Sequence, residues 1–206
     1  MAGSQTPDEV RCAVLYPAVA EAARRAGASA IGLVGVGPAA GLDVQLDRVG
    51  ITYSDGRSLG DPASPVQVTA TVVGDRPVPA TRLPPVVARI AVARDPVARL
   101  AEAVAQVPVH ALPVVTTAWA LSRLAVSRRP LFLRRLQEVA AGRPVAWVSV
   151  EGVGVGPSVP TLGDRPASGH SITGLAVSDG AALQVEVLGR CWSRGRFLSW
   201  LAPGPR

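Results

Sequence analysis

The chain has 206 residues, of which 48% are apolar and 4% aromatic, so we expect one domain whose core is filled mainly by Val, Ala and Leu. The formal net charge is +6, and all 21 basic residues are Arg. A chain without Lys has no P-loop lysine and no Schiff-base lysine. The absence of Lys and Asn is typical of GC-rich coding, and no basic run alternates with aromatics as in single-strand binders, so we do not expect nucleic acid as a partner.

The start of the sequence and its two cysteines bear on location and metal binding. The first residues lack the basic and apolar regions of a signal peptide, and no apolar run reaches the ~18 residues that a membrane span needs. Cys12 and Cys191 lie far apart with no Cys or His at ligand spacing, so we predict two buried thiols and no metal site. These features favour a cytoplasmic protein that does not bind a membrane.

The first elements in chain order are a helix and a buried strand. The helix is predicted at residues 7 to about 26, and Pro17 inside it predicts a kink or a break into two short helices. Residues 30–37 form a continuous apolar run bounded by glycine, which is typical of a strand buried on both faces. A short helical or irregular piece is expected at 39–49.

A turn-rich region follows at residues 51–80. Alternating residues at 66–73 predict a strand, a second strand is expected at 51–54, and Asp55-Gly56 predicts a turn. We interpret this region as an excursion of antiparallel strands within the domain.

From residue 86 onward, apolar strands alternate with amphipathic helices. Asp95 and Pro96 form a helix start, with Asp as the N-cap. Strands are predicted at 86–92, 112–117 and 145–150, and helices at 95–107, 118–124 and 129–141. This alternation predicts right-handed crossovers and a mostly parallel sheet.

The end of the chain has a different pattern. After a loop rich in Gly and Pro at 151–169, two apolar runs at 172–178 and 182–191 flank Asp179-Gly180, a strong signal for an antiparallel hairpin. A short helix is predicted at 194–201. The elements together predict an α/β, Rossmann-like domain over residues 1–206, with a mostly parallel sheet, flanking helices, the β excursion and a C-terminal hairpin.

The glycine-rich turn after the first strand is the best candidate for a binding site. Ligands of open α/β sheets lie at the carboxyl ends of the strands, and Gly35, Gly37 and Gly41 would let the backbone approach a ligand closely. The spacing Gly-x-Gly-x-x-x-Gly is not the dinucleotide fingerprint, and Pro38 removes one donor N–H. The alternative is a tight strand-to-helix connection without a ligand.

Polar residues near the ends of three strands are further candidates. Asp43 follows the glycine turn and could contact hydroxyls of a ligand; the alternative is that it caps a helix or pairs on the surface, as for Asp47. Thr116, Thr117 and Glu151 each end a predicted parallel strand, and Glu151 would serve as a general base if its pKa were raised.

Aromatic and basic residues give weaker signals. Trp119 could stack on a base, although packing is the commoner role. No Gly-x-Ser-x-Gly elbow accompanies His110 and His170, which favours structural roles for both. A C-terminal group could bind an anion or let arginines cover apolar rings. It consists of Arg190, Trp192, Arg194, Arg196 and Trp200.

Several blocks of the chain resemble one known family. Residues 34–43 (Val-Gly-Val-Gly-Pro-Ala-Ala-Gly-Leu-Asp), with Leu46-Asp47-Arg48 and Tyr53 after them, resemble the signature block of the domain of unknown function 2332 family, an uncharacterised bacterial family. Blocks at 113–124, 143–152 and 189–201 are similar to that family in the same order. The family has no established activity, but its glycine block is similar to the cofactor loop of methyltransferases that use S-adenosylmethionine.

The chain departs from the family pattern at two acidic positions. Gly35 stands where the resemblance implies an acidic residue, and Ala93 stands where it implies an Asp, so Asp95 is the nearest candidate to take that role. Family members are typically longer, with extra N-terminal helices and a further segment between Ala93 and Leu100, which implies that this chain is a shortened member.

Two main functions follow from these features, and association with nucleic acid through arginine is a third, weaker option. The first is a methyltransferase-like protein that binds S-adenosylmethionine or a nucleotide at the glycine turn. The second is a non-catalytic binding or partner-interaction domain that has lost its acidic anchors; the partner would be a small molecule or a protein. The candidate catalytic residues are Glu151 and Thr117, and the candidate cofactor-binding residues are Gly35, Gly37, Gly41, Asp43, Asp95 and Thr116.

Overall fold

The computed structural model describes residues 5–178 and 183–203. The helices are α1 (Pro7–Val10), α2 (Cys12–Arg25), α3 (Ala40–Asp43), α4 (Pro96–Ala105) and α5 (Arg129–Ala140), with 3-10 turns η1 (Leu46–Arg48), η2 (Leu121–Arg123), η3 (Val126–Arg128), η4 (Pro166–Ser168) and η5 (Ser193–Gly195). The strands are β1 (Ile31–Val36), β2 (Gly50–Tyr53), β3 (Ser58–Gly60), β4 (Gln67–Val72), β5 (Val86–Val92), β6 (Leu112–Ala118), β7 (Val145–Gly152), β8 (Ser171–Ser178), β9 (Glu186–Trp192) and β10 (Phe197–Trp200).

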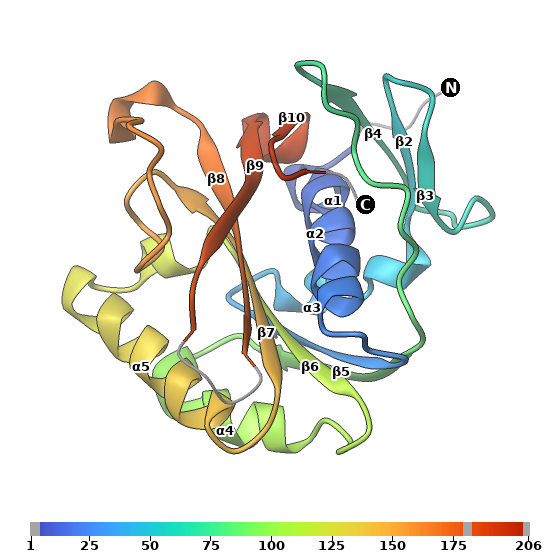
Figure 1. Cartoon of the computed structure of the whole chain (residues 1–206). Helices are drawn as coiled ribbons and strands as arrows, with labels where there is room; N and C mark the ends of the chain where they lie inside the picture. Colours follow the sequence, from blue (N-terminus) through green and yellow to red (C-terminus); the bar gives the residue numbers. More distant parts are fainter. Residues whose placement is uncertain (1–4, 179–182, 204–206) are drawn as a thin grey trace.

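The strands form one ten-stranded sheet in the order β3-β2-β4-β10-β9-β8-β7-β6-β1-β5 (Figure 1). Neighbours are parallel from β5 through β1 and β6 to β7, and again between β2, β4 and β10. They are antiparallel from β7 through β8 and β9 to β10. The predicted α/β class, mostly parallel sheet and antiparallel C-terminal strands are therefore confirmed, while the predicted Asp179-Gly180 turn lies outside the described residues.

Helices cover both faces of the sheet near β1, β6 and β7. The long helix α2 packs on one face, and α4 and α5 pack on the other (Figure 1). Alternate residues of each strand enter one of two apolar clusters, because successive side chains of a strand point to opposite faces. In β6, for example, Val114 belongs to the cluster with α2 and Val115 to the cluster with α4 and α5.

The first helix is interrupted, but not at the residue that the sequence suggests. Helices α1 and α2 meet at Arg11, whereas Pro17 lies inside α2. Proline has no N–H to donate to the carbonyl group four residues earlier, which here is that of Ala13. The hydroxyl of Tyr53 donates to that carbonyl oxygen at 2.7 Å, so the freed acceptor has a partner and α2 continues past Pro17.

The predicted excursion at residues 51–80 joins the main sheet. The two predicted strands are present as β2 and β4, but β4 runs parallel to β2 and also pairs in parallel with β10. The antiparallel partner of β2 is the short strand β3, which the sequence analysis did not identify. An entirely antiparallel excursion is therefore wrong. Pairing with β10 is a contact between distant parts of the sequence, which local alternation does not reveal.

Three other predicted elements differ from the structure. Strand β5 is an edge strand and only partly buried, not buried on both faces. The helix expected at 118–124 is the short 3-10 turn η2, because β6 extends to Ala118. The helix expected at 194–201 is strand β10, in which Leu198 and Trp200 alternate into the core as strand period 2 requires.

Both cysteines have the environment that the sequence predicts. Cys12 and Cys191 are buried and unpaired, and burial raises the pKa of each thiol to about 12. Among the described residues, no helix has both the length and the apolar composition that a membrane crossing requires.

Candidate functional site

The glycine turn after β1 packs tightly against its own chain. Gly37 has a φ of 107°, and a Cβ atom at this residue would lie 2.7 Å from the Cβ of Ala120. A Cβ on Gly35 would lie 2.7 Å from the carbonyl oxygen of Ala40, whereas one on Gly41 would meet no atom within 4 Å. Close packing of the chain therefore requires the first two glycines, and Gly41 is the one of the three that borders open space.

Glu151 lies near the end of β7 and is 2% exposed. Its Oε1 accepts hydrogen bonds of 2.8 Å from the backbone N–H groups of Ala120 and Leu121, so it fixes the start of η2. Its Oε2 is buried and has no hydrogen-bond partner among the described residues. Burial raises the pKa of Glu151 to about 7, which is the shift that the sequence left open and that a general base needs.

Thr116 and Thr117 are adjacent in β6 and therefore lie on opposite faces of the sheet. Both are fully buried. The Oγ1 of Thr117 accepts a 3.1 Å hydrogen bond from Nε1 of Trp147, on the face of α4 and α5. Glu151 shares that face by strand alternation, while Thr116 faces α2. The structure thus groups Thr117 with Glu151 and separates Thr116 from both.

Asp43 lies in α3 on the face of α2 and is fully buried. Its Oδ1 is 3.5 Å from Nη1 of Arg11, and neither oxygen has a hydrogen-bond partner among the described residues. Burial raises the pKa of Asp43 to about 7, against the opposing effect of the Arg11 charge. The alternative of pairing on the surface is therefore wrong for Asp43, although Asp47 does pair with Arg89 at 2.7 Å.

Asp95 has the predicted helix-capping role. Its side chain accepts the backbone N–H of Ala98 at 3.4 Å at the start of α4, and its Oδ1 also pairs with Arg128 at 2.6 Å. The hydrogen bond from Arg128 lowers the pKa of Asp95. The residue is exposed and has a φ of 42°. This carboxylate already binds two groups of the same chain, and its role in cofactor binding stays a prediction.

Trp119 directly follows β6 and is held at several points. It has a φ of 52°, and its Nε1 donates to Oγ of Ser171 at 2.8 Å. The guanidinium carbon of Arg11 lies 5.5 Å from the ring centroid, and that of Arg194 lies 5.2 Å from it. The half-buried indole therefore carries two cation–π contacts from distant parts of the sequence.

The C-terminal basic and aromatic residues do not form one group. Arg194 reaches Trp119, whereas Nε of Arg190 pairs with Oδ2 of Asp164 at 2.6 Å. Nε2 of His170 lies 2.9 Å from the same oxygen, and its ring is tilted against that of Trp192 in β9, with 5.6 Å between the ring centroids. Arg190 and Arg194 therefore have different surroundings, and the charge of Arg190 is neutralised.

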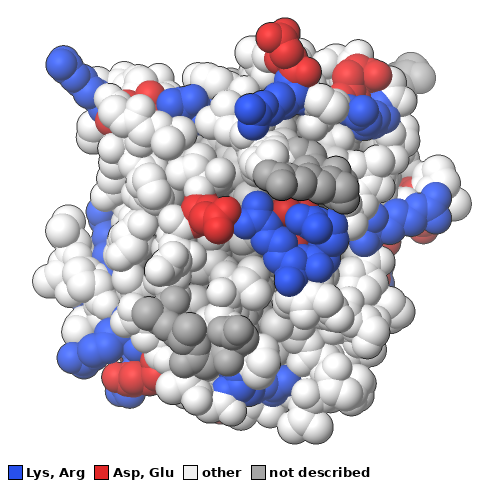
Figure 2. All heavy atoms as spheres, viewed as in Figure 1, with Lys and Arg blue, Asp and Glu red and all other residues white. Residues whose placement is uncertain are grey.

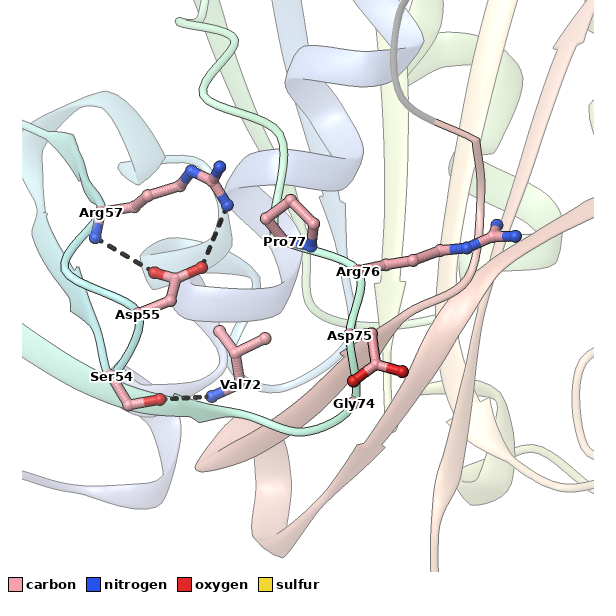
Figure 3. Close-up of a pocket in the computed structure, with 8 residues that line it drawn as sticks. All are labelled: Ser54, Asp55, Arg57, Val72, Gly74, Asp75, Arg76 and Pro77. Carbon is pink, nitrogen blue, oxygen red and sulfur yellow. Dashed lines mark hydrogen bonds and ion pairs between the residues drawn. The ribbon is translucent and has the colours of Figure 1, made fainter.

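A cavity of about 520 Å³ lies away from the glycine turn, between the β2–β3 turn and the end of β4 (Figure 3). Four of its polar side chains bind one another or nearby backbone. Asp55 accepts from Arg57, and the hydroxyl of Ser54 accepts the N–H of Val72 at 2.9 Å. Figure 3 shows Arg76 extending away from this group, and its guanidinium donates to the carbonyl oxygen of Leu201. The cavity has no contact with the predicted site residues.

The charged surface is mixed rather than basic throughout. Figure 2 shows arginine and acidic side chains beside each other over one face of the molecule. Arg24 and Arg25 both pair with Glu21, and Arg135 pairs with Glu138. Many arginines are therefore already neutralised locally.

Sequence reasoning missed Arg11, which connects several candidate residues. It is 4% exposed, pairs with Asp8 and Asp43, and donates to the carbonyl oxygen of Ala118 at 3.4 Å. The i,i+3 spacing of Asp8 and Arg11 was the available signal. Its contacts with α3 and the end of β6 depend on the tertiary fold.

Comparison with known protein families matches residues 2–99 and 91–200 to the family described as "Uncharacterized protein conserved in bacteria (DUF2332)". The chain belongs to this family. The two matched segments overlap at 91–99, which comprises the end of β5, the loop that contains Asp95 and the first turn of α4. Searches of curated proteins and of solved structures each found no match.

Proposed function

We propose that the chain is a non-catalytic binding or partner-interaction domain in which its own backbone closes the crevice at the glycine turn. The contact between Gly37 and Ala120 carries the proposal. Ligands of open α/β sheets lie outside the carboxyl ends of two adjacent strands, at the point where the strand order reverses. Here that place is at the carboxyl ends of β1 and β6, since β5 flanks β1 on its other side. The start of η2 lies there, at a distance that leaves no room even for a Cβ on Gly37.

Glu151 supports this proposal because it anchors the closing segment. Its two hydrogen bonds to the N–H groups of Ala120 and Leu121 satisfy donors at the start of η2. Both of those residues are buried. A carboxylate used in this way stabilises the fold and is not free to abstract a proton through Oε1.

Calorimetry and thermal shift with S-adenosylmethionine and S-adenosylhomocysteine test the proposal. A ligand at ~100 times its Kd would stabilise the fold by ~2.7 kcal/mol, so binding is readily seen. We expect neither a saturable heat nor a shift in Tm at millimolar ligand. Saturable binding by the unmodified chain would contradict a closed crevice.

A second candidate is the methyltransferase-like function, with S-adenosylmethionine at Gly35–Gly41 and Thr117 and Glu151 facing the substrate. The strand order β5-β1-β6-β7 favours it, because Rossmann-like sheets also place the first strand between the second and a later one. The open space beside Gly41 and the pKa of about 7 at Glu151 agree with it.

The variant Gly41→Val separates the two candidates. A Cβ at this position meets no atom within 4 Å, so we expect the fold to survive. If the cofactor binds at the turn, wild type binds it and Gly41→Val does not. If the crevice is closed, neither protein binds it.

A further inference from the structure

Arg194 and Arg11 contact the same indole but differ in what else they bind. Arg11 is buried and committed to Asp8, Asp43 and the carbonyl oxygen of Ala118. Arg194 is exposed, and within residues 5–178 and 183–203 its guanidinium has neither an acidic partner nor a hydrogen bond. Its guanidinium carbon lies over the Trp119 ring, 5.2 Å from the centroid, while its N–H donors remain available.

The backbone holds Arg194 in this position at an energetic cost. Ser193, Arg194 and Gly195 have successive φ values of 47°, 58° and 99°. Such a conformation is unfavourable for a non-glycine residue and persists only where the surrounding structure enforces it. A Cβ on Gly195 would lie 3.0 Å from the carbonyl oxygen of Val10, so the turn packs closely on the end of α1.

The indole is held just as firmly. Trp119 also has a left-handed backbone, and its Nε1 is bound to Ser171. Two strained residues from distant segments thus meet, near the carboxyl end of β6. Strained backbone of this kind is concentrated at ligand-binding positions.

We infer that Arg194, stacked on Trp119, binds the oxyanion group of a small molecule, a phosphate or a carboxylate. A guanidinium presents parallel N–H donors that match two oxygens of such a group, and stacking fixes its plane in advance. The half-buried ring limits exposure of the ion pair to water on one side, which strengthens it. The inference rests on the proposed function, because it names the ligand chemistry of the binding domain.

Titration with inorganic phosphate and, separately, with oxalate tests the inference, at constant ionic strength with chloride as the reference anion. The readouts are tryptophan fluorescence and calorimetry. We expect saturable binding of one or both anions, and the stronger of the two identifies the source of the oxyanion. The variant Trp119→Phe should lose the fluorescence response while calorimetry still detects binding.

Substitutions at the arginine make the test specific. Arg194→Ala should weaken binding about tenfold or more, and Arg194→Lys should also weaken it because the planar fork is lost. Arg196→Ala is the matched control, since Arg196 is also exposed and lies two residues away; it should bind as wild type does. Thermal unfolding of each variant checks that the fold is kept.

Non-saturable titrations with both anions would overturn the inference, and so would equal losses in Arg194→Ala and Arg196→Ala. Either result leaves the proposed function intact, because that function fails only if S-adenosylmethionine or S-adenosylhomocysteine binds. The two failures are therefore distinguishable.

Discussion

Asp43 and Glu151 are both buried carboxyl groups near the carboxyl ends of the parallel strands, yet their partners differ. Burial raises the pKa of each to about 7. Asp43 faces the guanidinium of Arg11 on the side of α2, whereas Glu151 accepts two backbone N–H groups on the side of α4 and α5. Through these partners, both faces of the sheet hold the 118–121 segment. The cost of burying Asp43 is offset by the charge of Arg11, and the cost of burying Glu151 is offset by hydrogen bonds from two peptide N–H groups.

The largest effect is expected from removing the carboxylate that binds peptide groups. Glu151→Ala should lower the free energy of unfolding by about 4 kcal/mol, because two buried N–H donors lose their acceptor. Urea denaturation measures the change. Glu102→Ala is the control; Glu102 is exposed and paired only at 3.8 Å, so its loss should cost less than about 1 kcal/mol.

The two amide substitutions, Glu151→Gln and Asp43→Asn, compare the two carboxyl groups more closely. Glu151→Gln keeps an oxygen that accepts both N–H groups and should cost less than Glu151→Ala. Asp43→Asn removes the charge opposite Arg11 and should be the more damaging of the two amide substitutions. Equal effects of Glu151→Gln and Glu151→Ala would show that the hydrogen bonds at η2 do not hold this segment.

Stability should fall as pH rises from about 4 to about 7. A carboxyl whose folded-state pKa is raised holds its proton more tightly in the native state than in the unfolded chain. Its stabilising contribution is therefore complete below about pH 4 and is lost as pH approaches 7, with a total on the order of 3 kcal/mol per group. The pKa values of Asp95 and Asp164 are lowered, so these two groups change their protonation below this pH range and do not contribute to the fall.

Urea denaturation at pH 5 and pH 8 measures this effect. Wild type should be more stable at pH 5, and Glu151→Gln should show a smaller difference because one of the two groups no longer titrates. Asp43→Asn should do the same on the other face. A wild-type protein with equal stability at both values would contradict the raised pKa values.

The sequence predicted the order of the main strands and helices because their signals are local. The apolar run of β1, the Asp95 cap of α4 and the period of α5 depend on a few neighbouring residues each. The place of β4 beside β10 depends on pairing between residues more than a hundred positions apart, which no local pattern encodes.

The position of the candidate site could be predicted from the sequence, but the contacts between its side chains could not. Strand ends located Gly37, Asp43 and Glu151 near one edge of the sheet. Strand alternation also separates Thr116 from Thr117, and this rule was available from the sequence. The contacts of Arg11 and of Arg194 with Trp119 were not, because each joins segments that meet only in the folded chain.

The smallest of the expected effects comes from a change at Gly37, and it tests whether the crevice at the carboxyl ends of β1 and β6 is closed. Gly37→Ala should lower the free energy of unfolding by about 2 kcal/mol, because the new Cβ meets that of Ala120 at 2.7 Å and the φ of 107° disfavours alanine. Gly41→Ala is the matched control and should cost almost nothing, since its Cβ meets open space.

A double-mutant cycle separates the clash from the backbone strain. Ala120→Gly removes the atom that Gly37→Ala would strike, so the double variant should be more stable than the sum of the two single changes predicts. The backbone part of the cost should persist, because the left-handed φ is unchanged. Strict additivity would mean that Ala120 does not press on Gly37 in solution. The crevice between β1 and β6 would then be open to a ligand, which favours the methyltransferase-like candidate.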